Sequence, residues 1–160
     1  MRPDERRRLT ACAIAPVVQT ETLPSERPAE SPISVVESFL GALQAKELER
    51  ALSLLADDVV YQNVPFPADR GKAAVVRTLK LFERVVTGFE VRMRNIAAQG
   101  GTVLTERVDV LSGPLLYLDI KVCGTFEVRD GKIVLWRDYF DLMETSAKLL
   151  VSPLRKLFVK

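Results

Sequence analysis

The chain has 160 residues, of which 48% are hydrophobic and 28% charged, enough apolar material for one globular domain with its own core. Its 23 basic and 21 acidic residues leave a net charge of +2, and no basic stripe interleaved with aromatic residues occurs, which argues against nucleic acid as a partner. Histidine is absent, which excludes Ser-His-Asp and Cys-His triads and the HExxH zinc motif.

Without imidazole, acid–base chemistry near neutral pH falls to carboxylates, tyrosine, lysine or cysteine. The two cysteines, Cys12 and Cys123, do not form a CxxC pair, and zinc sites need more ligands than these. We therefore expect no metal site, and we interpret Cys123 as a small buried hydrophobic residue. Such cysteine usage fits a reducing, cytoplasmic location.

Residues 1–30 are predicted to form a disordered N-terminal extension, because polar residues and prolines dominate its second half. The apolar run from Ala11 to Val18 is interrupted by Pro16 and is short for the apolar part of a signal peptide. It is also far shorter than the ~20 apolar residues of a membrane span. We expect neither secretion nor stable membrane insertion.

The folded domain is predicted to span residues 31–160 and to begin with three helices. Ser31 is a suitable N-cap for the first, with Pro32 at the first helical position. Apolar residues then recur at helical spacing in this helix, in a second over 47–56 and in a third over 72–86. The inward-facing residues are Val35, Val36, Phe39, Leu40 and Leu43 in the first helix, Leu48, Leu52 and Leu55 in the second, and Val75, Leu79, Phe82 and Val86 in the third.

A short strand over 59–64 is predicted between the second and third helices, and four longer strands follow the third. Their predicted ranges are 89–98, 102–112, 115–129 and 132–142. Gly100-Gly101 and Asp130-Gly131 are predicted hairpin turns. Long antiparallel strands with segregated helices indicate an α+β domain, in which a curved sheet wrapped by the helices would enclose an apolar pocket.

The last segment, residues 144–160, is apolar and contains Pro153. It is predicted to be one helix or two half-helices. Such a segment would either cover the pocket mouth or form a subunit contact, and the sequence leaves both alternatives open.

Two of the long strands carry charged residues among apolar neighbours. Side chains alternate across a strand, so Arg107 and Asp109 share a face with Thr105 and Leu111, about 6.5–7 Å apart along it. An isolated pair of this kind is most simply a weak ion pair on an exposed sheet face. Burying charged groups inside the domain, in contrast, costs free energy unless the charges are paired or serve a function.

The strand over 133–141 favours charges inside the domain over an exposed ion pair. Asp138 is the only charge on a face shared with Val134, Trp136 and Phe140. Such a carboxylate has a raised pKa unless a cation compensates it, and Arg107 is the natural cation. In the strand over 59–64, Tyr61 and Asn63 share a face and could hold a water molecule. Two carboxylates, one arginine and two water-holding groups form a set suited to acid–base catalysis.

Tyr61 and Asn63, then Glu106 to Leu111, then Trp136 to Asp141, in this order and spacing, resemble the limonene-1,2-epoxide hydrolase family over roughly residues 33–145. The resemblance is greatest to its mycobacterial branch, thought to act on bulkier lipid or sterol epoxides. It implies a single epoxide-hydrolase-like domain with the cone-shaped fold of ketosteroid isomerases and nuclear transport factor relatives. It also implies a homodimer and no cofactor.

The resemblance further implies one-step addition of water to a lipophilic epoxide, giving a vicinal diol. Asp138 would be the general base, taking a proton from a water molecule held by Tyr61, Asn63 and Asp138 itself. Asp109, kept protonated, would donate a proton to the epoxide oxygen. Arg107 would bond to both carboxylates and help to set their unequal protonation.

By resemblance and by strand face, nine apolar residues are expected to line the substrate pocket, although each could simply belong to the core. They are Leu40, Leu43, Leu79, Phe82, Val86, Leu111, Ile120, Val122 and Phe140. Leu111 and Phe140 are the strongest candidates, because each lies two residues from a predicted catalytic aspartate on its own strand face.

Three other functions fit the same predicted fold. Ketosteroid isomerases use an aspartate base with a tyrosine and a protonated aspartate, but isomerisation needs no arginine between two aspartates and no bound water. A polyketide-cyclase-like enzyme is a second alternative. The third is a non-catalytic module that binds an apolar small molecule, in which some of the five polar residues should have been lost.

Overall fold

The computed structural model of the protein describes residues 30–114 and 116–158. The helices in these ranges are α1 (Pro32–Gln44), α2 (Leu48–Ser53), α3 (Lys72–Val85) and α4 (Leu142–Phe158). The strands are β1 (Leu55–Val64), β2 (Asp69–Arg70), β3 (Gly88–Gln99), β4 (Thr102–Ser112), β5 (Tyr117–Arg129) and β6 (Lys132–Phe140). The predicted extension lies outside the described residues apart from Glu30, and its disorder stays a prediction.

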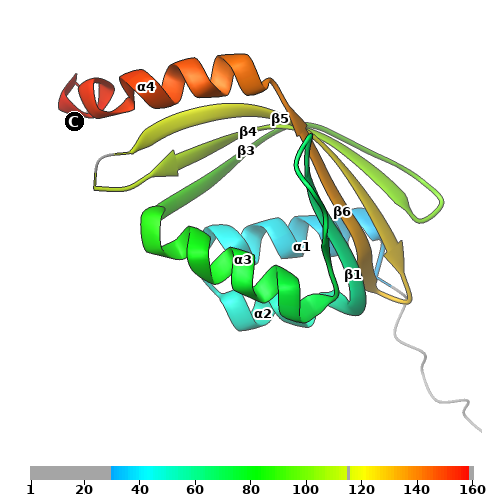
Figure 1. The fold of residues 1–160 in the computed structure, drawn as a ribbon. Helices are drawn as coiled ribbons and strands as arrows, with labels where there is room; N and C mark the ends of the chain where they lie inside the picture. The colour runs from blue at the N-terminus through cyan, green and yellow to red at the C-terminus, as the bar shows by residue number, and fades with distance from the viewer. Residues whose placement is uncertain (1–29, 115, 159–160) are drawn as a thin grey trace, which may run out of the picture.

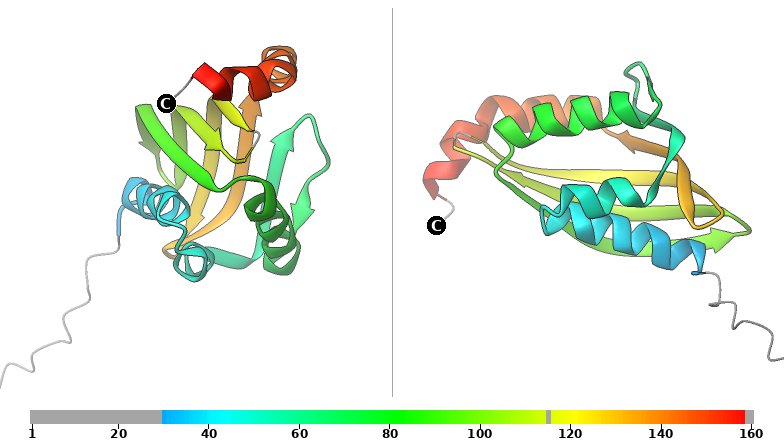
Figure 2. Two further views of the ribbon diagram at one scale, coloured as in Figure 1. Left: turned by 90° about the vertical axis from the view of Figure 1, so that its left-hand side faces the viewer. Right: turned by 90° about the horizontal axis from the view of Figure 1, so that it is seen from below.

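The strands form one mixed sheet in the order β2-β1-β6-β5-β4-β3. β1 runs parallel to β6, and the other neighbours are antiparallel. The sheet is strongly curved, with α1, α2 and α3 gathered on its concave side and α4 along β5 (Figure 1). Figure 2 shows the same arrangement from two further sides, with α4 well separated from α1 and α2. The predicted α+β fold with a curved sheet is confirmed.

The main core lies between α1 and the concave face of the sheet. Ser31 caps α1 as predicted, accepting a hydrogen bond from the backbone N–H of Ser34 at 3.1 Å. From this helix, the fully buried Phe39 packs edge-on against Trp136 of β6, with ring centroids 5.0 Å apart, and against Phe126 of β5. Aromatic pairs in this geometry add to the stabilisation from burial. This cluster fixes α1 against the inner face of β5 and β6, the strand pair that includes Asp138.

The second helix is shorter than predicted. It ends at Ser53, and Leu55 is the first residue of β1 and pairs with Ile133 of β6. The spacing of Leu48, Leu52 and Leu55 fits a helix, but the backbone N–H of Ile133 donates to the carbonyl oxygen of Leu54 at 2.9 Å and so extends the sheet there. The two-residue strand β2 was also missed, because it lies in the predicted loop after β1.

Two further predictions about individual residues were wrong. Cys123 is exposed, because it lies on the outer sheet face opposite Glu106. Val134 was expected to share the inner face with Trp136, but a register irregularity between β5 and β6 makes the neighbouring Ile133 the fully buried residue. A bulge of this kind inserts one residue into a strand and reverses the alternation beyond it.

No helix in the described ranges combines the length and the apolar character that crossing a membrane requires.

Candidate active site

The sheet register brings the predicted polar residues together from β1, β4 and β6. Asn63 of β1 lies beside Asp138 of β6, and Asp138 in turn pairs with Gly124 of β5. Gly124 pairs on its other side with Thr105 of β4, two residues before Arg107. Because side chains alternate along each strand, these groups all face the concave side of the sheet.

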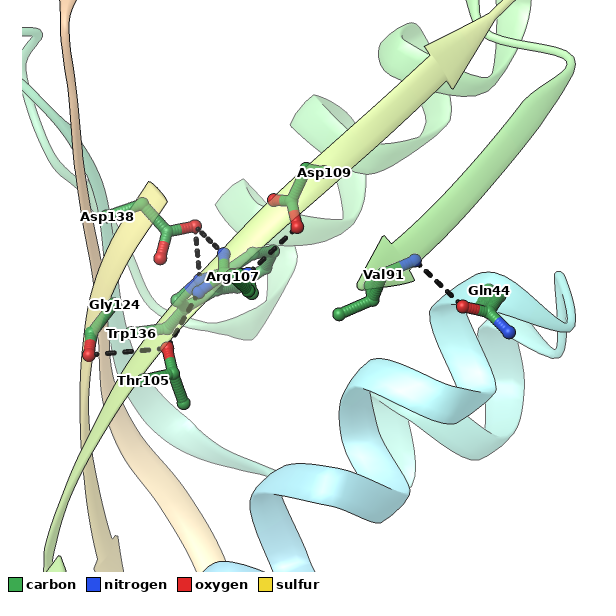
Figure 3. Close-up of polar contacts among 8 residues, drawn as sticks. All are labelled: Gln44, Val91, Thr105, Arg107, Asp109, Gly124, Trp136 and Asp138. Carbon is green, nitrogen blue, oxygen red and sulfur yellow. Dashed lines mark hydrogen bonds and ion pairs between the residues drawn. The ribbon is translucent and has the colours of Figure 1, made fainter. Parts of the chain in front are cut away.

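Arg107 is buried, with 1% of its surface exposed, and its three guanidinium nitrogens all donate hydrogen bonds (Figure 3). Nε donates to Asp109 Oδ1 at 2.9 Å, Nη2 to Asp138 Oδ2 at 2.8 Å, and Nη1 to Thr105 Oγ1 at 3.0 Å. Burial works against the charged guanidinium, but the two carboxylates outweigh it and raise the pKa of Arg107. The arginine therefore stays cationic and bridges two acids.

The two carboxylates have different surroundings. Burial raises the pKa of Asp109 to about 6, although the charge and hydrogen bond of Arg107 lower it. Burial also raises the pKa of Asp138, and three effects oppose this: the charge of Arg107, its hydrogen bond, and a second hydrogen bond from Trp136 Nε1 at 2.7 Å. In an apolar setting, the single positive charge of Arg107 compensates only one of the two carboxylates. The pair of acids therefore tends to keep one proton.

Among the described residues, the second carboxylate oxygen of Asp138 lacks a hydrogen-bond donor. In the part of the chain that the structure describes, no group donates a hydrogen bond to the buried Oδ1. Buried polar atoms without a protein partner are common sites for an ordered water molecule or a substrate group.

Tyr61 and Asn63 lie on β1, the strand next to Asp138. Asn63 Nδ2 donates to Tyr61 Oη at 2.5 Å, and the Tyr61 ring packs against Trp136 with centroids 4.0 Å apart. Burial, followed by the charge of Asp138, raises the pKa of Tyr61, so its hydroxyl keeps its proton at neutral pH. Asn63 lines the cavity described next, whereas Tyr61 is not among its lining residues.

A cavity of about 670 Å³ opens beside these groups, and Asp109, Asp138 and Asn63 form part of its wall. Eight of the nine predicted liners border it: Leu43, Leu79, Phe82, Val86, Leu111, Ile120, Val122 and Phe140. Leu40 does not, because it is only 2% exposed and belongs to the core on α1. Helical spacing places Leu40 on the inward side of α1 but does not distinguish core from cavity.

Several residues that line the cavity were not predicted from the sequence. Phe66, Phe89 and Trp136 border the cavity, and α4 contributes Leu142, Thr145, Ser146 and Leu149. The segment 142–149 of α4 therefore forms part of the cavity wall, and a subunit contact through the same helix stays a prediction. In the described ranges, no cluster of acidic and cysteine side chains is arranged to hold a metal ion.

Residues 30–150 match the model of the limonene-1,2-epoxide hydrolase catalytic domain. The chain belongs to the limonene-1,2-epoxide hydrolase family. It is similar to epoxide hydrolase EphG of Mycobacterium tuberculosis, with 44% identity over 131 residues, which cover 82% of this chain and 87% of the relative.

Solved structures agree with this family assignment. A limonene-1,2-epoxide-hydrolase-like epoxide hydrolase from M. tuberculosis superposes with a TM-score of 0.73 at 42% identity, covering 79% of this chain and 95% of the other. A putative SnoaL-like polyketide cyclase from Shewanella putrefaciens has a TM-score of 0.68 at 11% identity, covering 75% and 96%. The second likeness shows the shared fold alone. The predicted family is confirmed, and the isomerase and cyclase alternatives are not favoured.

Proposed function

We propose that this protein is an epoxide hydrolase that adds water to a lipophilic epoxide in one step of general acid–base catalysis, giving a vicinal diol. The observation that carries the proposal is the buried Arg107, bridging two carboxylates at 2.9 and 2.8 Å in the wall of an apolar cavity. Family membership supports the reaction, and the geometry of the site supports the role of each residue.

Asp138 is assigned as the general base. Its Oδ2 accepts hydrogen bonds from Arg107 and Trp136, which stabilise the ionised form, while Oδ1 is free to bond a water molecule. Asn63 and Tyr61 would hold that water from the neighbouring strand. As the water oxygen attacks an epoxide carbon, its proton passes to Asp138.

Asp109 is assigned as the general acid. It accepts one hydrogen bond from Arg107 and borders the cavity, so its carboxyl group can reach an epoxide oxygen. When the carbon–oxygen bond of the ring breaks, the electron pair stays on that oxygen and the proton of Asp109 neutralises it. Asp138 then releases the proton it gained and Asp109 takes one up, with no net change in protons, which restores both carboxyl groups. Each proton transfer can contribute about 10²–10⁴-fold to the rate, and positioning several kcal/mol more.

The lining supports a terpenoid, sterol or other lipid epoxide as the substrate. Apart from the polar groups of the site and five other polar residues, the wall is made of leucine, isoleucine, valine and aromatic side chains. Such a wall binds by removing apolar surface from water and does little to orient polar substituents.

Assembly and location are separate proposals. We expect a homodimer in the cytoplasm, as the family resemblance and the low cysteine content suggest. The half-exposed Leu104 and Tyr139 would suit an interface on the outer sheet face. Sedimentation velocity would test the dimer, and a monomer at micromolar concentration would contradict it.

The reaction can be tested by isotope labelling. Limonene oxide, styrene oxide and a sterol epoxide, incubated in ¹⁸O-water with excess enzyme, are expected to give diols labelled in the first turnover. Water would then be the direct source of the new oxygen. Unlabelled diol in the first turnover would indicate a covalent ester to a carboxylate, and no diol from the whole panel would favour the binding-module alternative.

The pH dependence should reflect Asp109. A general acid must carry its proton, so kcat/KM is expected to fall as the pH rises above about 6, the pKa to which burial raises Asp109. The decline should approach about tenfold per pH unit. Measuring kcat/KM from pH 5 to 9 tests this, and a constant value above pH 7 would remove Asp109 from the role of acid.

A further inference from the structure

The guanidinium group of Arg107 lies in a recess of the sheet whose floor is Gly124. This glycine lies within β5, between Thr105 of β4 and Asp138 of β6. A Cβ atom at position 124 would lie 2.3 Å from Arg107 Nη1, 2.6 Å from Thr105 Oγ1 and 2.9 Å from Asp138 Oδ1. All three distances are shorter than real Cβ contacts. The space that a side chain would fill therefore holds the arginine (Figure 3).

Backbone conformation does not explain this glycine. Gly124 has the extended backbone of a strand, which any residue adopts, and a glycine inside a strand is otherwise unfavourable. A glycine at such a position marks the close approach of another group. Here that group is a charged side chain.

Thr105 forms the side wall of the recess. It is buried, and its Oγ1 accepts from Arg107 Nη1 at 3.0 Å while donating to the carbonyl oxygen of Gly124 at 3.4 Å. The second bond directs a lone pair of the hydroxyl towards the arginine. Because this acceptor is neutral, it satisfies the third guanidinium nitrogen without adding another negative charge.

An aromatic ring from the same strand as Gly124 also lies against the guanidinium group. The Phe126 ring centroid lies 5.9 Å from the guanidinium carbon of Arg107. The guanidinium is thus confined between an aromatic ring, a hydroxyl and a bare backbone, with its two remaining nitrogens facing the acids.

From this recess we infer that Gly124 and Thr105 are positioning residues, which hold Arg107 where it can bond to Asp109 and Asp138 at once. The inference deepens the proposed function and rests on it for the role of those acids. Neither residue borders the cavity, so each acts through Arg107 and not on the substrate. Loss of the Thr105 hydroxyl, or a side chain at position 124, would displace the guanidinium group. Asp109 and Asp138 would then no longer both bond to Arg107.

Four variants test the inference. Thr105→Val removes the hydroxyl without changing the size of the side chain, and Thr105→Ser keeps the hydroxyl. Gly124→Ala fills the recess. Gly41→Ala is its matched control, because a Cβ at Gly41 meets nothing within 4 Å.

Thr105→Val and Gly124→Ala are expected to lower kcat by about 10- to 100-fold, the effect of a small misplacement of catalytic groups, with little change in KM. Thr105→Ser should keep most of the wild-type kcat, and Gly41→Ala all of it. A purely structural role would instead lower the yield of folded protein and leave the kcat of the folded fraction unchanged.

A second measurement does not depend on turnover. Carbon-13 NMR titration of the Asp109 carboxyl should give a higher pKa in Thr105→Val and Gly124→Ala than in the wild type, because Arg107 would stabilise its charge less. Thr105→Ser should match the wild type. Unchanged kcat and unchanged titration in Thr105→Val would overturn the inference, even if Gly124→Ala did not fold. If the wild type made no diol, the proposed function would fail, while the titration would still decide whether the recess positions Arg107.

Discussion

Asp138→Asn is expected to lower kcat by about 10³-fold or more while leaving the fold intact. Asparagine has nearly the shape of aspartate, and its carbonyl oxygen can still accept the hydrogen bonds from Arg107 and Trp136. It cannot take a proton from water. The loss should exceed that of a base alone, because removing the Asp138 charge leaves Arg107 to stabilise ionised Asp109 and so depletes the acid as well.

Azide separates these two effects. It attacks an epoxide carbon without losing a proton, so it needs no general base. Azide should therefore restore part of the ring opening in Asp138→Asn, measured as azido alcohol by chromatography. Asp130→Asn is the matched control, since Asp130 is exposed in the β5–β6 turn with a φ of 52°, which asparagine also adopts. A wild-type rate in Asp138→Asn would remove the residue from its role.

Asp109→Asn is expected to reduce kcat by about 10²–10⁴-fold for an epoxide whose ring opens to a basic alkoxide. The amide can keep the bond from Arg107 Nε through its oxygen, but it cannot protonate the epoxide oxygen. The size of the loss should depend on the substrate. A trifluoromethyl-substituted epoxide, which opens to a weakly basic alkoxide, should lose much less, and azide should not help either substrate.

The pair of variants thus gives opposite patterns. Azide should partly restore Asp138→Asn, and an electron-poor epoxide should partly restore Asp109→Asn. Equal responses of the two variants to both treatments would contradict the assignment of separate acid and base roles to these carboxylates.

Much of the site could be predicted from alternation along single strands. Period two places Arg107 with Asp109, Trp136 with Asp138, and Tyr61 with Asn63 on the same faces, and the structure has them on the concave side. The α+β class followed from helices that precede long strands joined by Gly100-Gly101 and Asp130-Gly131. Both turns contain residues with positive φ, as tight hairpins require.

The spacing of apolar residues was less informative about which element each residue packs against. Leu40 and Leu43 are both on the inward side of α1, yet one is in the core and the other borders the cavity. Leu55 fits a helix by spacing but pairs with Ile133 in the sheet. The packing angle of a helix and the hydrogen bonds of a distant strand decided these cases.

The sequence by itself determined the chemistry available to this protein: no histidine, two acids and an arginine at alternating positions, and a motif order typical of one family. Tertiary structure alone decided that Gly124 leaves room for the Arg107 side chain, that Thr105 satisfies its third nitrogen, and that α4 completes the cavity. The physical reason is register. A side chain's face depends on its own strand, but the group it meets depends on hydrogen bonds with strands far away in the sequence.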